Sequence, residues 1–140
     1  NAYDYFVKNE KDFEGYVIVT FDLNNLKQCN DQYGHRAGDE YIINAAHIIE
    51  DNFERYGKCY RIGGDEFCCI IPKGRYFKIE RVMHKIDQDV EILNHKNIIP
   101  VPVGIAYGYA VFTADDTDPE KVRERADKDM YRNKKTMKQS

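Results

Sequence analysis

The stretch KCYRIGGDEFCCII, residues 58–71, decides the fold of this chain. It contains two short runs of apolar, β-branched and aromatic residues on either side of a Gly-Gly-Asp turn, a pattern that predicts two paired strands. Gly63 and Gly64 tolerate positive φ, so we expect a tight hairpin between the strands. This hairpin presents two adjacent carboxylates, Asp65 and Glu66, at its tip.

Strand and helix patterns alternate on both sides of the hairpin. The run GYVIVTFDL, for example, is apolar almost throughout, as expected for a strand covered on both faces. This order predicts an α/β fold with a central, mostly antiparallel sheet and flanking helices, of the ferredoxin-like or polymerase-palm type. The expected elements beyond the hairpin are strands over 15–23 and 101–112 and helices over 26–33, 38–53, 79–93 and from Pro119 onward.

Length and composition predict one globular domain over residues 1–140. Hydrophobic residues make up 42% of the chain and charged residues 32%, an ordinary balance for a folded domain. A net charge of −3 provides no general attraction to a nucleic acid polymer or an anionic membrane, and we expect no nucleic acid polymer as a partner. The chain begins at Asn1 without a Met, so we expect a cytoplasmic domain of a longer, regulated protein that is free to carry a membrane anchor elsewhere.

The four cysteines follow no metal-binding or disulfide pattern. No CxxC pair occurs, and no His residues have matching ligand spacing. Adjacent Cys68 and Cys69 are expected to point to opposite faces of a strand. We therefore expect reduced thiols at apolar positions and neither a zinc site nor a disulfide.

Acidic residues at two strand ends predict a metal site. Asp22 ends the first strand, and Asp65 lies at the hairpin tip. If the hairpin pairs beside the first strand, the two carboxylates meet at one edge of the sheet and repel each other unless a cation lies between them. Mg²⁺ suits one or two carboxylates combined with substrate phosphates. Taken alone, the Asp65-Glu66 dipeptide would equally suit a solvated turn.

Three motifs in the expected order resemble one family. RIGGDEF contains the signature of the GGDEF family, the diguanylate cyclases, which condense two GTP into cyclic di-GMP. The block FDLNNLKQCNDQYGHRAGDEYI (21–42) is similar to the family pattern FDxDxFKxxNDxxGHxxGD, and DPEKVRERADKDMYRNKK (118–135) resembles its ADxAMYxAK helix. The resemblance spans the chain from its first strand to its last helix and implies the nucleotidyl cyclase form of the palm fold.

The resemblance implies a catalytic metal centre. Asp22 and Asp65 would coordinate Mg²⁺, with Mn²⁺ as a second option, together with the backbone carbonyl of Leu23. Asp22, Asp65 and Glu66 are the expected catalytic residues, although Glu66 would equally serve as a hydrogen-bond partner behind the metal ligands.

The resemblance also implies a GTP-binding set. Asn30 and Asp39 would hydrogen-bond guanine, since a carboxylate accepts from both donors on its Watson–Crick edge, which adenine lacks. The remaining expected contacts are with the phosphates, through side chains or close backbone approach, and come from Lys27, Arg61, Gly63, Gly64, Lys134 and Lys138.

The implied reaction is attack of one GTP 3′-hydroxyl on the α-phosphate of a second GTP, with loss of pyrophosphate. Because one domain would bind one GTP, homodimerisation is expected, driven by an attached sensory or dimerisation domain. The main alternative is a non-catalytic GTP-binding module that regulates a neighbouring domain. The presence of both Asp22 and Asp65 favours the enzyme, and the guanine-reading pair argues against a weaker third option, cyclisation of a single nucleotide.

Several positions depart from the family pattern. Asn24 replaces a frequent second Asp, which predicts altered metal affinity, and Lys138 stands where some relatives have Arg. ERYG (54–57) replaces the inhibitory RxxD motif, so we expect no tight product inhibition by that route. His35 is expected to be structural.

Overall fold

The structure, a computed structural model, describes residues 2–9, 12–74 and 78–139, with the backbone alone at residues 2, 6 and 135–139. Its elements in chain order are α1 (Ala2–Asn9), β1 (Val17–Asn24), α2 (Leu26–Tyr33), α3 (His35–Phe53), β2 (Lys58–Arg61), β3 (Glu66–Ile71), α4 (Ile79–His95), β4 (Gly104–Val111) and α5 (Pro119–Gln139).

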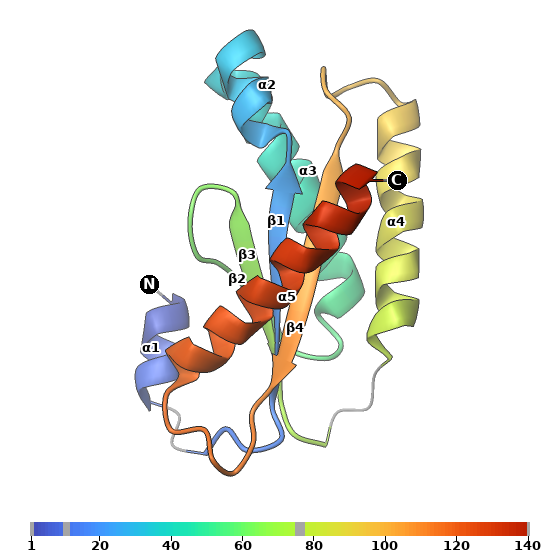
Figure 1. Cartoon of the computed structure of the whole chain (residues 1–140). Coiled ribbons are helices and arrows are strands. Elements are labelled where there is room, and N and C mark those ends of the chain that lie inside the picture. Colours follow the sequence, from blue (N-terminus) through green and yellow to red (C-terminus); the bar gives the residue numbers. More distant parts are fainter. Residues whose placement is uncertain (1, 10–11, 75–77, 140) are drawn as a thin grey trace.

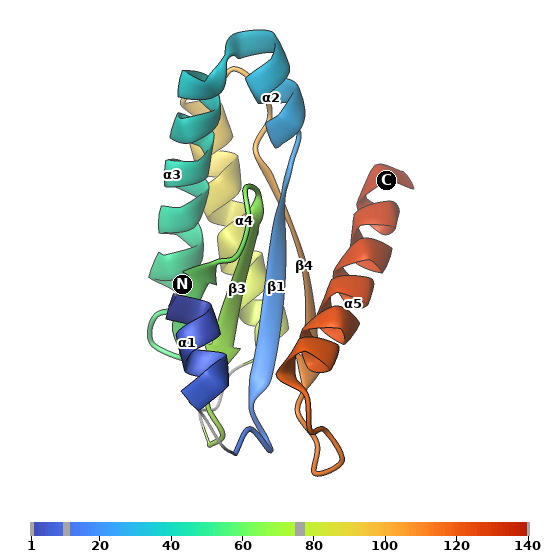
Figure 2. The same ribbon diagram turned by 90° about the vertical axis from the view of Figure 1, so that its left-hand side faces the viewer.

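A four-stranded antiparallel sheet lies at the centre of the described part, in the order β2-β3-β1-β4 (Figure 1). Figure 2 shows α3 and α4 on one side of the sheet and α5 on the other. The short helix α1 packs on the α5 side, where Tyr3 joins the buried cluster formed with Val122 and Ala126. The predicted fold class is confirmed, since the sheet is antiparallel and its helices flank it.

Strand β1 is central and covered on both faces, as its apolar sequence predicts. Val19, Phe21 and Leu23 pack into the cluster beneath α3 and α4, whereas Ile18 belongs to the cluster beneath α5. Because side chains alternate along a strand, Asp22 faces the α5 side. The first predicted metal ligand therefore lies opposite a helix that begins 97 positions later in the sequence.

The predicted hairpin is present, but its turn differs from the expectation. Strands β2 and β3 pair from Lys58 to Arg61, and residues 62–65 form the loop. Neither Gly63 nor Gly64 has a positive φ, so that prediction is wrong. The loop is longer than a two-residue turn and closes instead when the amides of Ile62 and Gly63 donate to the Glu66 carbonyl, at 2.9 and 3.4 Å.

The cysteine prediction is wrong for one pair. Cys59 and Cys69 are direct partners in the β2–β3 register, with Cα atoms 4.2 Å apart, and form a disulfide. Sequence spacing hides this pair because only the strand register brings the two residues face to face. Cys29 and Cys68 are buried free thiols, as expected, and Cys68 and Cys69 do face opposite sides of the sheet.

Helix α5 lies directly on β4 because Gly108 has no side chain. A Cβ atom there would lie 2.1 Å from the Met130 amide nitrogen and 2.4 Å from the Ala126 carbonyl oxygen. This close approach fixes the depth of the helix that faces Asp22. In the described part of the chain, no helix combines the length and apolar character needed to cross a membrane.

Candidate active site

The two predicted metal ligands come together at one end of the sheet. Pairing of β1 with β3 places Asp22 opposite Glu66, and the Leu23 amide donates to the Asp65 carbonyl at 3.1 Å. The Asp22 side chain is only 18% exposed. Its Oδ2 atom accepts a hydrogen bond from Lys134, whereas its Oδ1 atom is buried with no hydrogen-bond partner among the described residues.

The electrostatics at this end of the sheet suit a cation. Burial, and then the negative charge of Asp22, raise the pKa of Asp65 above its usual range. The unpartnered Asp22 oxygen and the nearby Asp65 carboxylate are hard oxygen donors, so these residues fit Mg²⁺. No cluster of three or more His, Cys, Asp or Glu side chains with metal-binding geometry occurs in the described residues. A cation here would therefore need further oxygen ligands from its substrate.

A pocket of about 470 Å³ opens beside the acids, between α2, α3 and the hairpin loop. Six of the predicted site residues line it. Leu26, Asp31, His35 and Ile42 complete the lining, and none of these was predicted to contact substrate. The predicted residues in the lining are Lys27, Asn30, Asp39, Arg61, Gly64 and Asp65.

Helices α2 and α3 hold Asn30 and Asp39 on the same wall of this pocket. The Asn30 side chain lies against the backbone of Gly38, where a Cβ atom would be 1.7 Å from Asn30 Oδ1. Tyr41 fixes the start of α3 by donating to the Asn24 carbonyl and accepting from the Gly104 amide at 3.0 Å. Close packing against Gly38 therefore restricts the side chain of Asn30, and guanine binding by Asn30 and Asp39 stays a prediction.

Arg61 is occupied by the hairpin itself. Its guanidinium donates to the carbonyls of Gly63 and Gly64 at 3.2 and 2.9 Å. It therefore stiffens the loop at the pocket wall, and phosphate contact stays a prediction. A Cβ atom on Gly63 or Gly64 would meet nothing within 4 Å, so the loop surface is open to a ligand.

The predicted phosphate-binding lysines are in different situations. Lys134 extends from α5 and pairs with Asp22, so its ammonium neutralises the acid that was expected to bind metal. Lys27 lines the pocket at the start of α2. The Lys138 side chain lies outside the described residues.

Sequence reasoning missed the groups around Glu66. This carboxylate also faces α5, where it accepts a hydrogen bond from Arg123 at 3.3 Å. Burial, and then the charge of Asp127, raise the pKa of Glu66 to about 7. Asp127 belongs to the ADKDMY segment, which is similar to the family pattern quoted above, so the sequence offered a reason to consider it. Nothing in the sequence pointed to Arg123.

A second hollow, of about 510 Å³, lies between α3 and α4, and its lining includes His47, Arg55 and Lys85. It contains none of the predicted site residues. Despite its slightly greater volume, the chemistry points to the pocket beside Asp65.

Known proteins resemble this chain along most of its length. The family model for the diguanylate cyclase GGDEF domain matches residues 6–140. The bifunctional diguanylate cyclase/cyclic di-GMP phosphodiesterase MucR of Pseudomonas aeruginosa is 30% identical over 125 residues, which are 86% of this chain and 18% of that protein. Diguanylate cyclase DgcS of Shewanella oneidensis is 30% identical over 118 residues, 84% of this chain and 38% of that protein.

Solved structures agree with the fold. Diguanylate cyclase SiaD of Pseudomonas aeruginosa, in complex with its activator SiaC, matches with a TM-score of 0.73 and 26% identity, over 86% of this chain and 46% of that one. The predicted nucleotidyl cyclase form of the palm fold is thereby confirmed. The matched region spans less than half of the length of each of these curated relatives and of the SiaD chain.

Proposed function

Because this chain belongs to the GGDEF domain family of diguanylate cyclases, we propose that it is a catalytically competent cyclase domain that condenses two GTP into cyclic di-GMP. In the proposed reaction the 3′-hydroxyl of one GTP attacks the α-phosphate of the other, and pyrophosphate leaves. The same exchange then closes the ring.

One observation carries this proposal more than any other. The Asp22 Oδ1 atom is buried and unpartnered beside Asp65, although a buried carboxylate oxygen ordinarily finds a donor. Two acids kept this close, beside a pocket lined by a predicted guanine-reading pair, favour a metal-dependent nucleotide reaction over simple GTP binding.

Each residue has a proposed task. Asn30 and Asp39 bind the guanine edge, and Lys27 binds phosphate at the mouth of the pocket. Asp22, Asp65 and the Leu23 carbonyl are the residues that would hold Mg²⁺. When bound, this cation supplies neutralisation of the triphosphate charge.

Lys134 is proposed to act on the triphosphate. Its ammonium pairs with Asp22 in this structure, and its side chain is 26% exposed. An ammonium on a flexible stem can move from a carboxylate to a nearby phosphate oxygen. We therefore propose that the Lys134 ammonium moves from Asp22 to the triphosphate when nucleotide is bound.

The proposed active unit is a homodimer, because each domain offers one guanine pocket and the product contains two guanines. A sensory or dimerisation domain elsewhere in the full protein would bring two copies face to face. This arrangement is part of the proposal and rests on the stoichiometry of the reaction.

The test is a product assay on a forced dimer. The domain, fused to a parallel coiled coil, is incubated with GTP and Mg²⁺, and the nucleotides are separated and identified by mass. Asp65→Ala is the matched variant, checked for folding by its thermal melt. Cyclic di-GMP from the parent alone supports the proposal. GTP that binds but stays unchanged would instead assign the domain to the non-catalytic GTP-binding regulators.

A further inference from the structure

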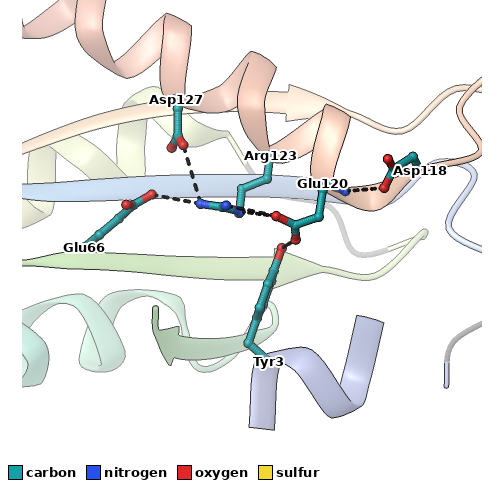
Figure 3. A network of polar contacts seen from close by, with 6 residues as sticks. All are labelled: Tyr3, Glu66, Asp118, Glu120, Arg123 and Asp127. Carbon is teal, nitrogen blue, oxygen red and sulfur yellow. Dashed lines mark hydrogen bonds and ion pairs between the residues drawn. The ribbon is translucent and has the colours of Figure 1, made fainter. Parts of the chain in front are cut away.

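A chain of polar contacts joins the N-terminal helix to the signature acid Glu66, as Figure 3 shows. The Tyr3 hydroxyl of α1 donates to Glu120 Oε1 at 2.9 Å. Glu120 accepts from Arg123, and Arg123 in turn donates to Glu66. Three elements that are far apart in the sequence, α1, α5 and β3, therefore meet through four side chains.

Arg123 uses its whole guanidinium fork in this chain. Its Nε and Nη2 atoms donate to one oxygen of Glu120, at 3.1 and 2.9 Å. This leaves Nη1 to contact Glu66 Oε1 at 3.3 Å and Asp127 Oδ2 at 3.5 Å. Its side chain is only 20% exposed, so these contacts are shielded from water and their geometry is restricted.

Arg123 also balances a local excess of negative charge. Three carboxylates, those of Glu66, Glu120 and Asp127, surround one guanidinium. Without it, Glu66 and Asp127 would face each other as like charges, and the Glu66 side chain would turn away from Asp127. The orientation of Glu66 therefore depends on Arg123.

Tyr3 fixes the far end of the chain. It is 3% exposed, and its ring packs edge-on against Tyr60 of β2, with centroids 5.9 Å apart. Its hydroxyl holds the Glu120 oxygen that Arg123 does not use. A shift of α1 would therefore move Glu120, and with it the guanidinium that contacts Glu66.

We propose that Arg123 is a positioning residue for Glu66. Tyr3, through Glu120, links the position of α1 to the orientation of Glu66 in the active site. This inference rests on the proposed cyclase function, because it assigns Glu66 a part in the reaction. Glu66 lies directly opposite Asp22 in the strand register and next to Asp65, so a change in its orientation alters the metal end of the site. The predicted guanine-reading pair, held on α2 and α3, should not change.

Three variants of the forced dimer test the proposal. Arg123→Lys keeps the charge but loses the fork that serves Glu120 and Glu66 together. Tyr3→Phe removes only the hydroxyl that holds Glu120. Arg125→Gln is the matched control, because Arg125 lies on the same helix and forms a similar pair with Asp116, at 2.8 Å, away from the site.

Two measurements separate positioning from plain stability. Cyclase kinetics below the melting temperature give kcat and KM for GTP. Amide hydrogen exchange at Ile62 and Gly63 reports on the backbone at Glu66 without any need for activity, because both amides donate to the Glu66 backbone carbonyl. We expect Arg123→Lys to lower kcat about tenfold, the value of one charge-assisted hydrogen bond, with KM within about twofold of wild type.

The amide hydrogens of Ile62 and Gly63 should exchange faster in Arg123→Lys than in wild type. Tyr3→Phe should change both readouts in the same direction by about threefold, and Arg125→Gln should change neither. If Arg123→Lys has the kcat and the amide exchange rates of wild type, the proposal is overturned. If Tyr3→Phe has both wild-type values, the role of α1 is overturned. A wild-type dimer that makes no product refutes the cyclase function instead, and the amide exchange then decides on positioning alone.

Discussion

Replacement of Gly38 by alanine should weaken GTP binding without unfolding the domain. Gly38 lies in the first turn of α3, beneath the side chain of Asn30. An added Cβ would lie 1.7 Å from Asn30 Oδ1 and 2.7 Å from its Cγ. The Asn30 amide therefore has to rotate away from its present position, and with it the predicted guanine contact.

The magnitude follows from two opposing effects. Alanine stabilises a helix interior by about 1 kcal/mol relative to glycine, whereas a displaced, off-rotamer Asn30 costs about 0.5–1.5 kcal/mol. The free energy of unfolding should therefore stay within about 1 kcal/mol of wild type. Loss of one neutral hydrogen bond to guanine, worth about 0.5–1.5 kcal/mol, should raise the Kd for GTP about 2- to 10-fold.

The assay is calorimetric titration with a non-hydrolysable GTP analogue and Mg²⁺, on a double-mutant cycle of Gly38→Ala and Asn30→Ala. In the Asn30→Ala background the clashing atoms are absent, so Gly38→Ala should leave the Kd unchanged and add about 1 kcal/mol of stability. The reasoning is refuted if Gly38→Ala binds the analogue as tightly as wild type. It is also refuted if Gly38→Ala raises the Kd by the same factor in the Asn30→Ala background as in wild type.

Three further predictions concern charge and packing. Asp22→Asn should weaken Mg²⁺ activation of product formation by at least about 100-fold. It should change the unfolding free energy by less than about 1 kcal/mol, because the pair with Lys134 is partly exposed. An unchanged Mg²⁺ titration would exclude Asp22 from the site. The guanidinium of Arg125 holds the pKa of Asp116 well below its usual range, so the ionised carboxylate stabilises the fold at neutral pH and this contribution is lost as the pH falls below about 4. Asp116→Asn should therefore cost about 1 kcal/mol at pH 7 and progressively less toward pH 2 in urea unfolding, whereas a constant difference would contradict the assignment. Gly108→Ala should destabilise the domain by about 1–3 kcal/mol in the same assay, since the added methyl group meets helix backbone; wild-type stability would mean that α5 can move off β4 at little cost.

Much of the fold could be predicted because local patterns were strong. The helix expected over 26–33 has the same bounds in the structure, since a Gly with φ of 89° follows it directly. Strand β1 was evident from its continuous apolar run, and the hairpin from two such runs with glycines between them. The pocket was predictable for the same reason, because most of its lining lies in one contiguous block of sequence.

The remaining contacts depend on strand register and on which face of the sheet a residue occupies. Cys59 meets Cys69 only because β2 and β3 pair in one particular register. Arg123 contacts Glu66 across 57 positions of sequence because both lie on the α5 side. A one-residue slip of a strand would turn Cys59, Cys69 or Glu66 to the opposite face, so sequence patterns alone could not specify the pairs.

The division of the site between the two faces of the sheet has a functional consequence. The predicted guanine-reading pair lies on α2 and α3, whereas Lys134 and Arg123, which contact the strand-end acids, both come from α5. A change in the distance between α5 and the sheet should therefore alter the charge around the acids and leave base recognition intact. Gly108→Ala makes this change, so in the cyclase assay it should lower kcat more than it raises KM, and the opposite order would show that the two faces are not separate in function.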